Sequence, residues 1–163
     1  MNTLMSVTIA PERPDTPEAA ALVSELDDLL IPMYPIESHH GLSVESLIAE
    51  EVAFFVLRIN AVAVGCGGVK IYADGYGEVK RMFIRPPYRG MGLSKLMLTH
   101  LESYAHQQGV PILRLETGVL QHEAIGLYRR MGFTEIVPFG PYQPDIHSLF
   151  FEKRKKASLG ERT

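Results

Sequence analysis

The feature that most constrains this sequence is a change of hydrophobic period between residues 78 and 98. Residues 78–84 have the pattern of a strand that ends in an apolar run, and residues 85–88 form a loop interrupted by two prolines. From Gly92 onward the apolar residues recur at helical spacing, as Leu93, Leu96, Met97 and Leu101. The segment therefore predicts a strand, a tight basic turn and a helix.

The turn itself, Arg89-Gly90-Met91-Gly92, has the chemistry of an anion site. The N–H groups of a first helical turn have no carbonyl partners within the helix, and the helix dipole adds roughly half a positive charge at that end. Gly90 and Gly92 would let a ligand approach the main chain, so a phosphate or pyrophosphate is the expected occupant. An ordinary basic loop closed by two turn-forming glycines is the alternative that these four residues leave open.

Size and composition indicate one globular domain. At 163 residues the chain can bury a core without disulfide or metal staples, and its 46% apolar and 21% charged residues indicate neither wholesale disorder nor a membrane span. The net charge of -3 argues against a nucleic-acid binder. We expect a single domain over residues 1–154 and a flexible polar tail over residues 155–163.

The sequence gives no indication of a metal site or of secretion. Cys66 is the only cysteine, which excludes an internal disulfide and a thiolate zinc cage. The adjacent His39 and His40 point in different directions, and no third ligand follows at helical spacing, so no metal site is expected. Residues 1–14 lack a basic segment followed by a long apolar run. We expect a cytoplasmic protein.

Strand and helix patterns alternate along the rest of the chain. A hairpin turn is predicted at Asn60, and the glycines that follow it suggest a bulge or a close backbone approach. The strand, helix and strand from residue 78 to residue 116 favour a right-handed parallel crossover. Strand patterns cover residues 6–10, 52–60, 61–73, 78–84, 112–116, 133–137 and 148–153, and helix patterns cover residues 16–31, 43–50, 92–107 and 122–131.

The order of these elements, together with two motifs, resembles the GCN5-related N-acetyltransferase (GNAT) superfamily. The family's turn, Gln or Arg, x, x, Gly, x, Gly or Ala, is matched by Arg89, Gly92 and Ser94, of which Ser94 is a departure. The family's second pattern, Asn-x-x-Ala-x-x-Leu-Tyr-x-x-x-Gly-Phe, is matched by Gln121, Ala124, Leu127, Tyr128, Gly132 and Phe133, with Gln121 in place of Asn. The resemblance covers residues 52–133 well and the two ends in topology only.

This resemblance implies an α/β (α+β) fold. Its sheet is twisted, central and mixed but mostly antiparallel, with six to seven strands, four flanking helices and a V-shaped split between the fourth and fifth strands. The resemblance also implies acetyl-CoA and no metal. The pyrophosphate would lie on the turn and helix start, and the pantetheine arm would add to the splayed edge of the fourth strand. The cofactor-binding residues are then Met82, Phe83, Ile84, Arg89, Gly90, Met91, Gly92, Leu93, Ser94, Lys95, Gln121 and Tyr128.

The resemblance also assigns catalytic roles. Tyr128 would be the general acid that protonates the departing thiolate, although a Tyr on the apolar stripe of a helix could serve packing alone. A backbone N–H near Met82 would stabilise the oxyanion. Glu78 aligns with a catalytic Glu of some family members, and Glu116 closes the fifth strand. Either could be the base, either could be a strand-edge charge paired with a neighbouring cation, and several family members use solvent instead.

In this superfamily two loops build the acceptor pocket, here residues 34–40 and 139–147. Tyr34, Glu37, His39 and Tyr142 are the expected substrate contacts, since acidic and aromatic groups suit a small cationic amine. We expect an N-acetyltransferase that acts on a primary amine of a small molecule or amino acid by direct attack on the thioester. A protein lysine or N-terminal acetyltransferase and a non-catalytic acetyl-CoA sensor remain alternatives. Nucleic-acid and membrane partners are not expected, and a homodimer remains open.

Overall fold

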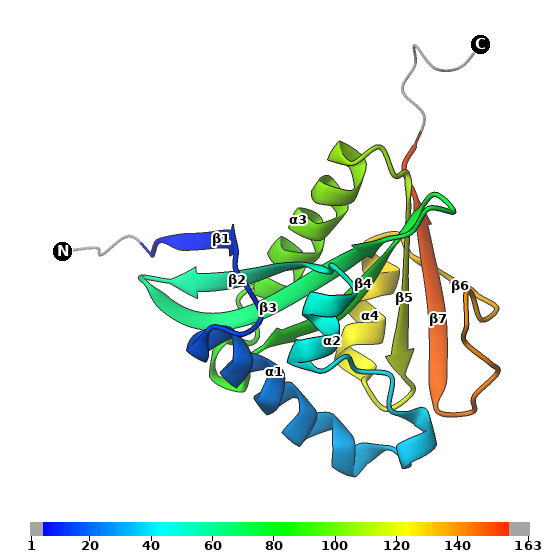
Figure 1. The fold of residues 1–163 in the computed structure, drawn as a ribbon, viewed down its shortest axis with the longest axis horizontal. Helices are drawn as coiled ribbons and strands as arrows, with labels where there is room; N and C mark the ends of the chain where they lie inside the picture. The colour runs from blue at the N-terminus through cyan, green and yellow to red at the C-terminus, as the bar shows by residue number, and fades with distance from the viewer. Residues whose placement is uncertain (1–4, 157–163) are drawn as a thin grey trace.

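The computed structural model describes residues 5–156, which form one sheet with helices on both faces (Figure 1). The strands are β1 (Val7–Pro11), β2 (Ala53–Ile59), β3 (Val62–Ile71), β4 (Tyr76–Ile84), β5 (Ile112–Gly118), β6 (Thr134–Ile136) and β7 (Ser148–Arg154). The helices are α1 (Pro17–Leu30), α2 (Val44–Ala49), α3 (Leu93–Gln107) and α4 (His122–Arg130), with short 3-10 turns η1 (Ile31–Met33), η2 (Ile36–Ser38) and η3 (Pro86–Tyr88).

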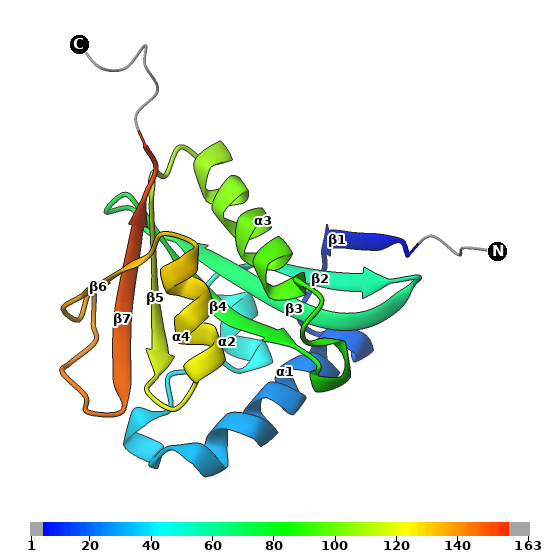
Figure 2. The ribbon, with the colours of Figure 1, turned by 180° about the vertical axis from the view of Figure 1, so that it is seen from behind.

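The strand order is β1-β2-β3-β4-β5-β7-β6. All neighbours are antiparallel except β4 and β5, which are parallel and are joined through α3. Helices α1 and α2 cover one face of the sheet, and α3 and α4 cover the other, as the two opposite views show (Figures 1 and 2). The predicted mixed, mostly antiparallel sheet with four flanking helices is confirmed.

The sheet divides between its two parallel strands. β4 and β5 pair only from Tyr76 with Ile112 to Glu78 with Arg114, although β4 continues to Ile84 and β5 to Gly118. Beyond that short ladder the two strands diverge, which Figure 2 shows between β4 and β5. The predicted V-shaped split is therefore present. On the sides where β4 and β5 face each other, it leaves main-chain groups of both strands without a neighbouring strand.

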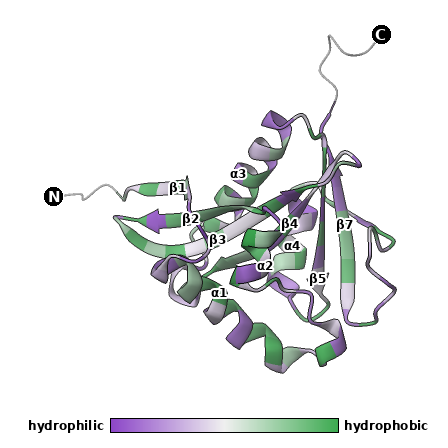
Figure 3. Ribbon diagram, in the orientation of Figure 1, coloured by the Kyte–Doolittle hydropathy of each residue, from purple (hydrophilic) through white to green (hydrophobic). Residues whose placement is uncertain are grey.

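Each face of the sheet has its own apolar core. On the α3 side, Met97 and Leu101 are fully buried against the sheet, and on the α1 side Leu22 and Leu26 are buried. Apolar and polar residues alternate around α1 in Figure 3, as expected for a helix with one buried side. A Cβ at Gly67 of β3 would lie 3.0 Å from Met97, so the predicted close backbone approach is confirmed: the glycine lets α3 settle onto the sheet.

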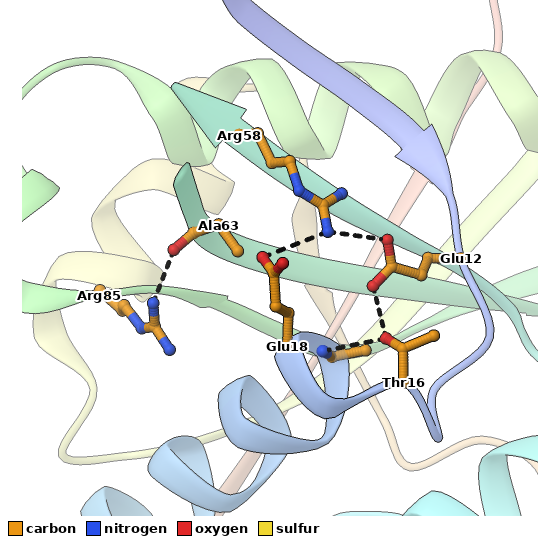
Figure 4. Close-up of polar contacts among 7 residues, drawn as sticks. Glu12, Thr16, Glu18, Arg58, Ala63 and Arg85 are labelled. Atoms are coloured by element: carbon orange, nitrogen blue, oxygen red, sulfur yellow. Dashed lines mark hydrogen bonds and ion pairs between the residues drawn. The ribbon is translucent and has the colours of Figure 1, made fainter. Parts of the chain in front are cut away.

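A polar cluster fixes the entry of α1 (Figure 4). The Arg58 guanidinium on β2 lies 2.9 Å from Glu12 and 3.3 Å from Glu18. The Thr16 hydroxyl donates to Glu12 and accepts the Ala19 N–H at 3.3 Å, which makes Thr16 the N-cap of α1. Beside it, Arg85 donates to the Ala63 carbonyl at 2.6 Å, so the end of β4 is tied to β3 close to the same helix.

Element boundaries differ from the sequence expectation at a few proline and turn positions. Pro11 is the last residue of β1 rather than the first residue after it, because an outer strand can place a residue without an N–H where no ladder bond is needed. The α-helix ends at Leu30, close to the predicted residue 31, and the 3-10 turn η1 follows it through Pro32. β4 begins at Tyr76, because its parallel pairing with β5 starts there. Of the predicted tail, residues 157–163 lie outside the described residues.

Candidate active site

The floor of the site is a bulge in β4 that the sequence did not place there. Lys80 pairs with Gly68 and Phe83 with Cys66, so Arg81 and Met82 together oppose the single residue Gly67. Arg81 has a φ of +54°, a left-handed backbone that is strained for a residue with a side chain. The bulge lets consecutive side chains share a face of the sheet: Lys80 contacts Glu78, and Arg81 contacts Asp27 of α1.

A cavity of about 310 Å³ lies at the split between β4 and β5. It is lined from both faces of the sheet, since Met82 and Tyr128 border it together with the loop that follows α1. Most of the residues predicted for catalysis and acceptor binding therefore come together. Those that line it are Tyr34, His39, Glu78, Met82, Glu116, Gln121, Tyr128 and Tyr142. Glu37 does not: it is exposed and borders a neighbouring surface hollow with Asp145.

Glu78 is almost fully buried and is held by three side chains. Its Oε2 accepts a hydrogen bond from the Tyr142 hydroxyl at 2.6 Å and lies 2.9 Å from the Lys80 ammonium. Its Oε1 accepts from the Tyr72 hydroxyl at 3.2 Å. Burial, and then the charge of Glu78, raise the pKa of Tyr142. Both oxygens of the Glu78 carboxylate are therefore engaged by side chains of the protein.

Glu116 on β5 is the less compensated carboxyl group. Among the described residues, no Lys or Arg forms an ion pair with it, and its hydrogen-bond donor is the Ser148 hydroxyl at 2.7 Å. Burial raises the pKa of Glu116 above its ordinary value, while the bond from Ser148 and the charge of His40 act in the opposite direction. A carboxyl group whose pKa is moved toward neutrality is the better proton acceptor at physiological pH.

Tyr128 of α4 is buried beside the rings of Phe133 and Phe151, with centroid distances of 5.9 and 6.1 Å. Burial raises the pKa of Tyr128, and the nearby Glu116 adds to that shift. Its hydroxyl is therefore protonated at neutral pH. Within residues 5–156 this hydroxyl has no hydrogen-bond partner, so packing accounts for the ring but leaves the proton available to a ligand in the cavity.

The predicted anion turn is open main chain at the start of α3. Gly90 and Gly92 have φ values of +81° and +77°, and a Cβ at either would meet nothing within 4 Å. The first intrahelical bond runs from the Leu96 N–H to the Gly92 carbonyl at 3.2 Å, so the N–H groups before it have no helical acceptor. Arg89 donates from Nε to the Ile84 carbonyl at 3.1 Å, which ties the turn to the end of β4.

The other predicted cofactor residues lie along this turn and along the split. Leu93 is buried in the α3 core, Ser94 is half-buried, and Met91 and Lys95 are exposed. Phe83 and Ile84 bury their side chains in opposite cores, which leaves only main chain for a ligand at this edge. The Gln121 amide oxygen accepts the Gly118 N–H at 2.9 Å, so it is engaged at the end of β5.

Long-range contacts bring the two loops that were expected to build the acceptor pocket to the cavity. A Cβ at Gly118 would lie 1.9 Å from the Tyr34 hydroxyl, so β5 ends in a glycine where Tyr34 crosses it. His40 and His147, which belong to those loops but were not named as individual substrate contacts, also line the cavity, and His40 lies 3.8 Å from Asp145 and edge-on to Tyr142. Lys80 and Arg81 line the cavity as well and were not predicted as site residues. Their place as adjacent cations before the glycine turn was the only sequence signal for these two.

Two further properties concern the described residues as a set. From residue 5 to residue 156, no cluster of three or more His, Cys, Asp or Glu side chains is arranged to hold a metal ion. Over the same range, none of the helices combines the length and the apolar character that crossing a membrane requires.

Comparison with known proteins identifies the class that this split sheet and cavity represent. Residues 23–133 match the Acetyltransferase (GNAT) family. The IAA acetyltransferase of Azospirillum brasilense is 45% identical over 149 residues, which cover 91% of this chain and 97% of that protein. YsnE of Bacillus subtilis, an uncharacterised N-acetyltransferase, is 32% identical over 84% of this chain and 92% of its own length.

A solved structure agrees over nearly the whole chain. A Klebsiella pneumoniae crystal structure, provisionally described as an acyl-CoA N-acyltransferase, superimposes with a TM-score of 0.77 at 36% identity and covers 91% of this chain and 97% of its own. The fold is thus that of an acyltransferase. The chain belongs to the acetyltransferase (GNAT) family of enzymes.

Proposed function

We propose that this protein is an acetyl-CoA-dependent N-acetyltransferase whose acceptor is a primary amine of a small molecule or amino acid. The observation that carries the proposal is the cavity at the split, which gathers Tyr128, Glu116 and Met82. Its volume of about 310 Å³ is at the small end of ligand pockets and favours a small acceptor over a polypeptide segment.

The open turn at the start of α3 fits the donor. Gly90 and Gly92 leave space above the main chain, and the free N–H groups of the first helical turn suit a pyrophosphate. Beyond Glu78, the edge of β4 that faces β5 has no partner strand, so it can bind the amides of a pantetheine arm. When bound there, acetyl-CoA supplies a thioester carbonyl carbon for attack by the amine.

Three groups of the chain then have distinct roles. Glu116 accepts a proton from the amine nitrogen, which its raised pKa favours. The Met82 N–H donates to the carbonyl oxygen as negative charge develops on it. The Tyr128 hydroxyl gives its proton to the departing sulfur. Glu78, with both oxygens already bonded, acts through Tyr142 rather than directly.

The test is thiol release from acetyl-CoA with a panel of amines, amino acids and short peptides, with a thermal shift by CoA as the binding control. The substrate named for the Azospirillum brasilense relative belongs in the panel. We expect CoA to raise the melting temperature and at least one small amine to release thiol. A protein that neither binds CoA nor releases thiol would contradict the proposal. Binding without turnover would favour the sensor alternative.

A further inference from the structure

The Arg81 side chain on the β4 bulge is only partly explained by its structural contacts. Nη2 donates to the Val23 carbonyl at 3.0 Å and to Asp27, both on α1. The side chain is 3% exposed, and its Nε is buried without a partner in the described chain. A buried guanidinium that served only to hold α1 would be expected to satisfy all its donors, because unpaired buried donors cost free energy.

The remaining nitrogen, Nη1, lies at the wall of the cavity. Arg81 and Gly41 both line that cavity, and a Cβ at Gly41 would lie 2.1 Å from Nη1. No described residue accepts a hydrogen bond from Nη1. Gly41 therefore leaves room for Nη1, and the two N–H groups of Nη1 have no acceptor from residue 5 to residue 156.

The backbone of Arg81 is held in a strained conformation that keeps the guanidinium there. A φ of +54° costs free energy for a residue with a Cβ, and such strain is typical of binding and catalytic positions. A regular strand would place Arg81 on the opposite face from Lys80. The bulge instead brings it to the acceptor side, on the same face as Glu78.

The cavity therefore offers a carboxyl group and a guanidinium that each have hydrogen-bonding capacity left for a ligand. Glu116 has no cationic partner among the described residues, and Arg81 presents free donors. A guanidinium binds a carboxylate with strong, geometrically specific hydrogen bonds. A ligand that carries both an ammonium and a carboxylate would complement the two groups, whereas a purely cationic amine would leave Nη1 of Arg81 without an acceptor, because the pair with Asp27 uses Nη2.

We propose that Arg81 is a specificity-determining residue that binds the carboxylate of the acceptor, so that the acceptor is an amino acid rather than a simple amine. This inference rests on the proposed function and narrows its substrate class. The amine of the acceptor faces Glu116, its carboxylate faces Nη1 of Arg81, and the arm of Arg81 bonded to α1 fixes the guanidinium plane.

The experiment compares matched ligands that differ at the carboxylate. The probes are L-phenylalanine, L-phenylalaninamide and phenethylamine, then L-leucine, L-leucinamide and isoamylamine, followed by the other common amino acids and their amides. Calorimetric binding to CoA-saturated protein is measured beside thiol release. We expect the best acid to bind at least about tenfold more tightly than its amide, as loss of a charged hydrogen-bonded pair implies.

Arg81→Met should reduce this preference to near unity, and Arg81→Lys should restore part of it. The same change on the surface, Arg129→Met, is the matched control and should leave the preference intact, since Arg129 is exposed and pairs with the exposed Glu135. If Arg81→Met fails to fold, Gly41→Ala tests the same point, because its Cβ would displace Nη1.

The outcomes separate this inference from the proposed function. Amides that bind as tightly as acids, or an acid preference that survives Arg81→Met or Gly41→Ala, would overturn the role of Arg81. Failure of every acid to bind would also overturn it. Acid binding that depends on Arg81 without thiol release would support the carboxylate site and contradict the transferase proposal.

Discussion

The Tyr142 hydroxyl, in the loop between β6 and β7, donates a 2.6 Å hydrogen bond to Glu78 in the middle of the sheet. The Lys80 ammonium lies 3.0 Å from the same hydroxyl and 2.9 Å from the same carboxylate. A residue of the loop between β6 and β7 is thereby tied to a buried charge. The loop and the sheet should lose stability together when this contact is removed.

Tyr142→Phe should lower the free energy of unfolding by about 2 kcal/mol, because it removes a hydrogen bond to a buried carboxylate. Chemical denaturation measures this change. Tyr72→Phe is the matched control, since it removes the longer 3.2 Å bond to the other oxygen of Glu78 and should cost less. Equal losses for the two variants would show that Tyr142 has no special part in holding Glu78.

Tyr128→Phe should reduce kcat by about 10²-fold while leaving stability and CoA affinity nearly unchanged. The reason is that the hydroxyl has no hydrogen-bond partner within the described chain, whereas the ring packs against Phe133 and Phe151. Steady-state kinetics and thermal unfolding with and without CoA provide the measurements. A variant as active as the wild type would remove Tyr128 from the chemistry.

The acid limb of the kcat/KM profile should lie above the ordinary carboxyl pKa of 4.5, because burial raises the pKa of Glu116. Activity should fall as the pH drops through that raised pKa, since the base becomes protonated. Ser148→Ala removes a hydrogen bond that lowers the pKa of Glu116, so the limb should move to higher pH. An unmoved limb would indicate that another group, or solvent, accepts the proton.

The same raised pKa has a consequence for stability. The folded protein holds the Glu116 proton more tightly than the unfolded chain does, so this group favours folding at low pH and loses that contribution as the pH rises toward its raised pKa. Glu116→Gln should abolish this part of the pH dependence. Urea titrations of both proteins across this pH range measure it, and parallel curves would contradict the assignment.

Gly92→Ala should weaken CoA binding and cost about 1 kcal/mol of stability, because φ is +77° at this N-cap and a Cβ is strained there. Gly75→Ala is the matched control: its φ is +93°, it is equally open, and it lies in the turn between β3 and β4. Both variants should lose similar stability, but only the first should lose CoA affinity. Equal CoA affinities would argue against the α3 turn as the phosphate site.

Cys66 should not react with thiol reagents at neutral pH until the protein unfolds. It is fully buried, its Sγ donates to the Arg81 carbonyl at 3.3 Å, and burial raises the pKa of Cys66 to about 12. Reagent uptake followed against denaturant checks this, with one thiol per chain appearing at the unfolding transition. Rapid labelling of the native protein would instead indicate opening of the β3–β4 pair.

The sequence by itself determined the architecture and the glycine turn at the start of α3. Hydrophobic periods, the capping Thr16 and the glycines of the α3 turn act over short distances, so their consequences could be predicted residue by residue. The order of strand and helix patterns then predicted the parallel pair at the split. The second family motif, from Gln121 to Phe133, likewise predicted Tyr128 as a site residue from a short stretch of sequence.

Only the tertiary structure decided which residues far apart in sequence meet at the cavity. The bulge that turns Arg81 toward α1 depends on the register between β3 and β4, which involves residues far apart in sequence. Likewise, Tyr142 meets Glu78 across 64 positions of the chain. The partners that the fold supplies, and not residue type, distinguish the fully bonded Glu78 from the uncompensated Glu116, because the groups that surround a carboxyl are a property of the packed molecule.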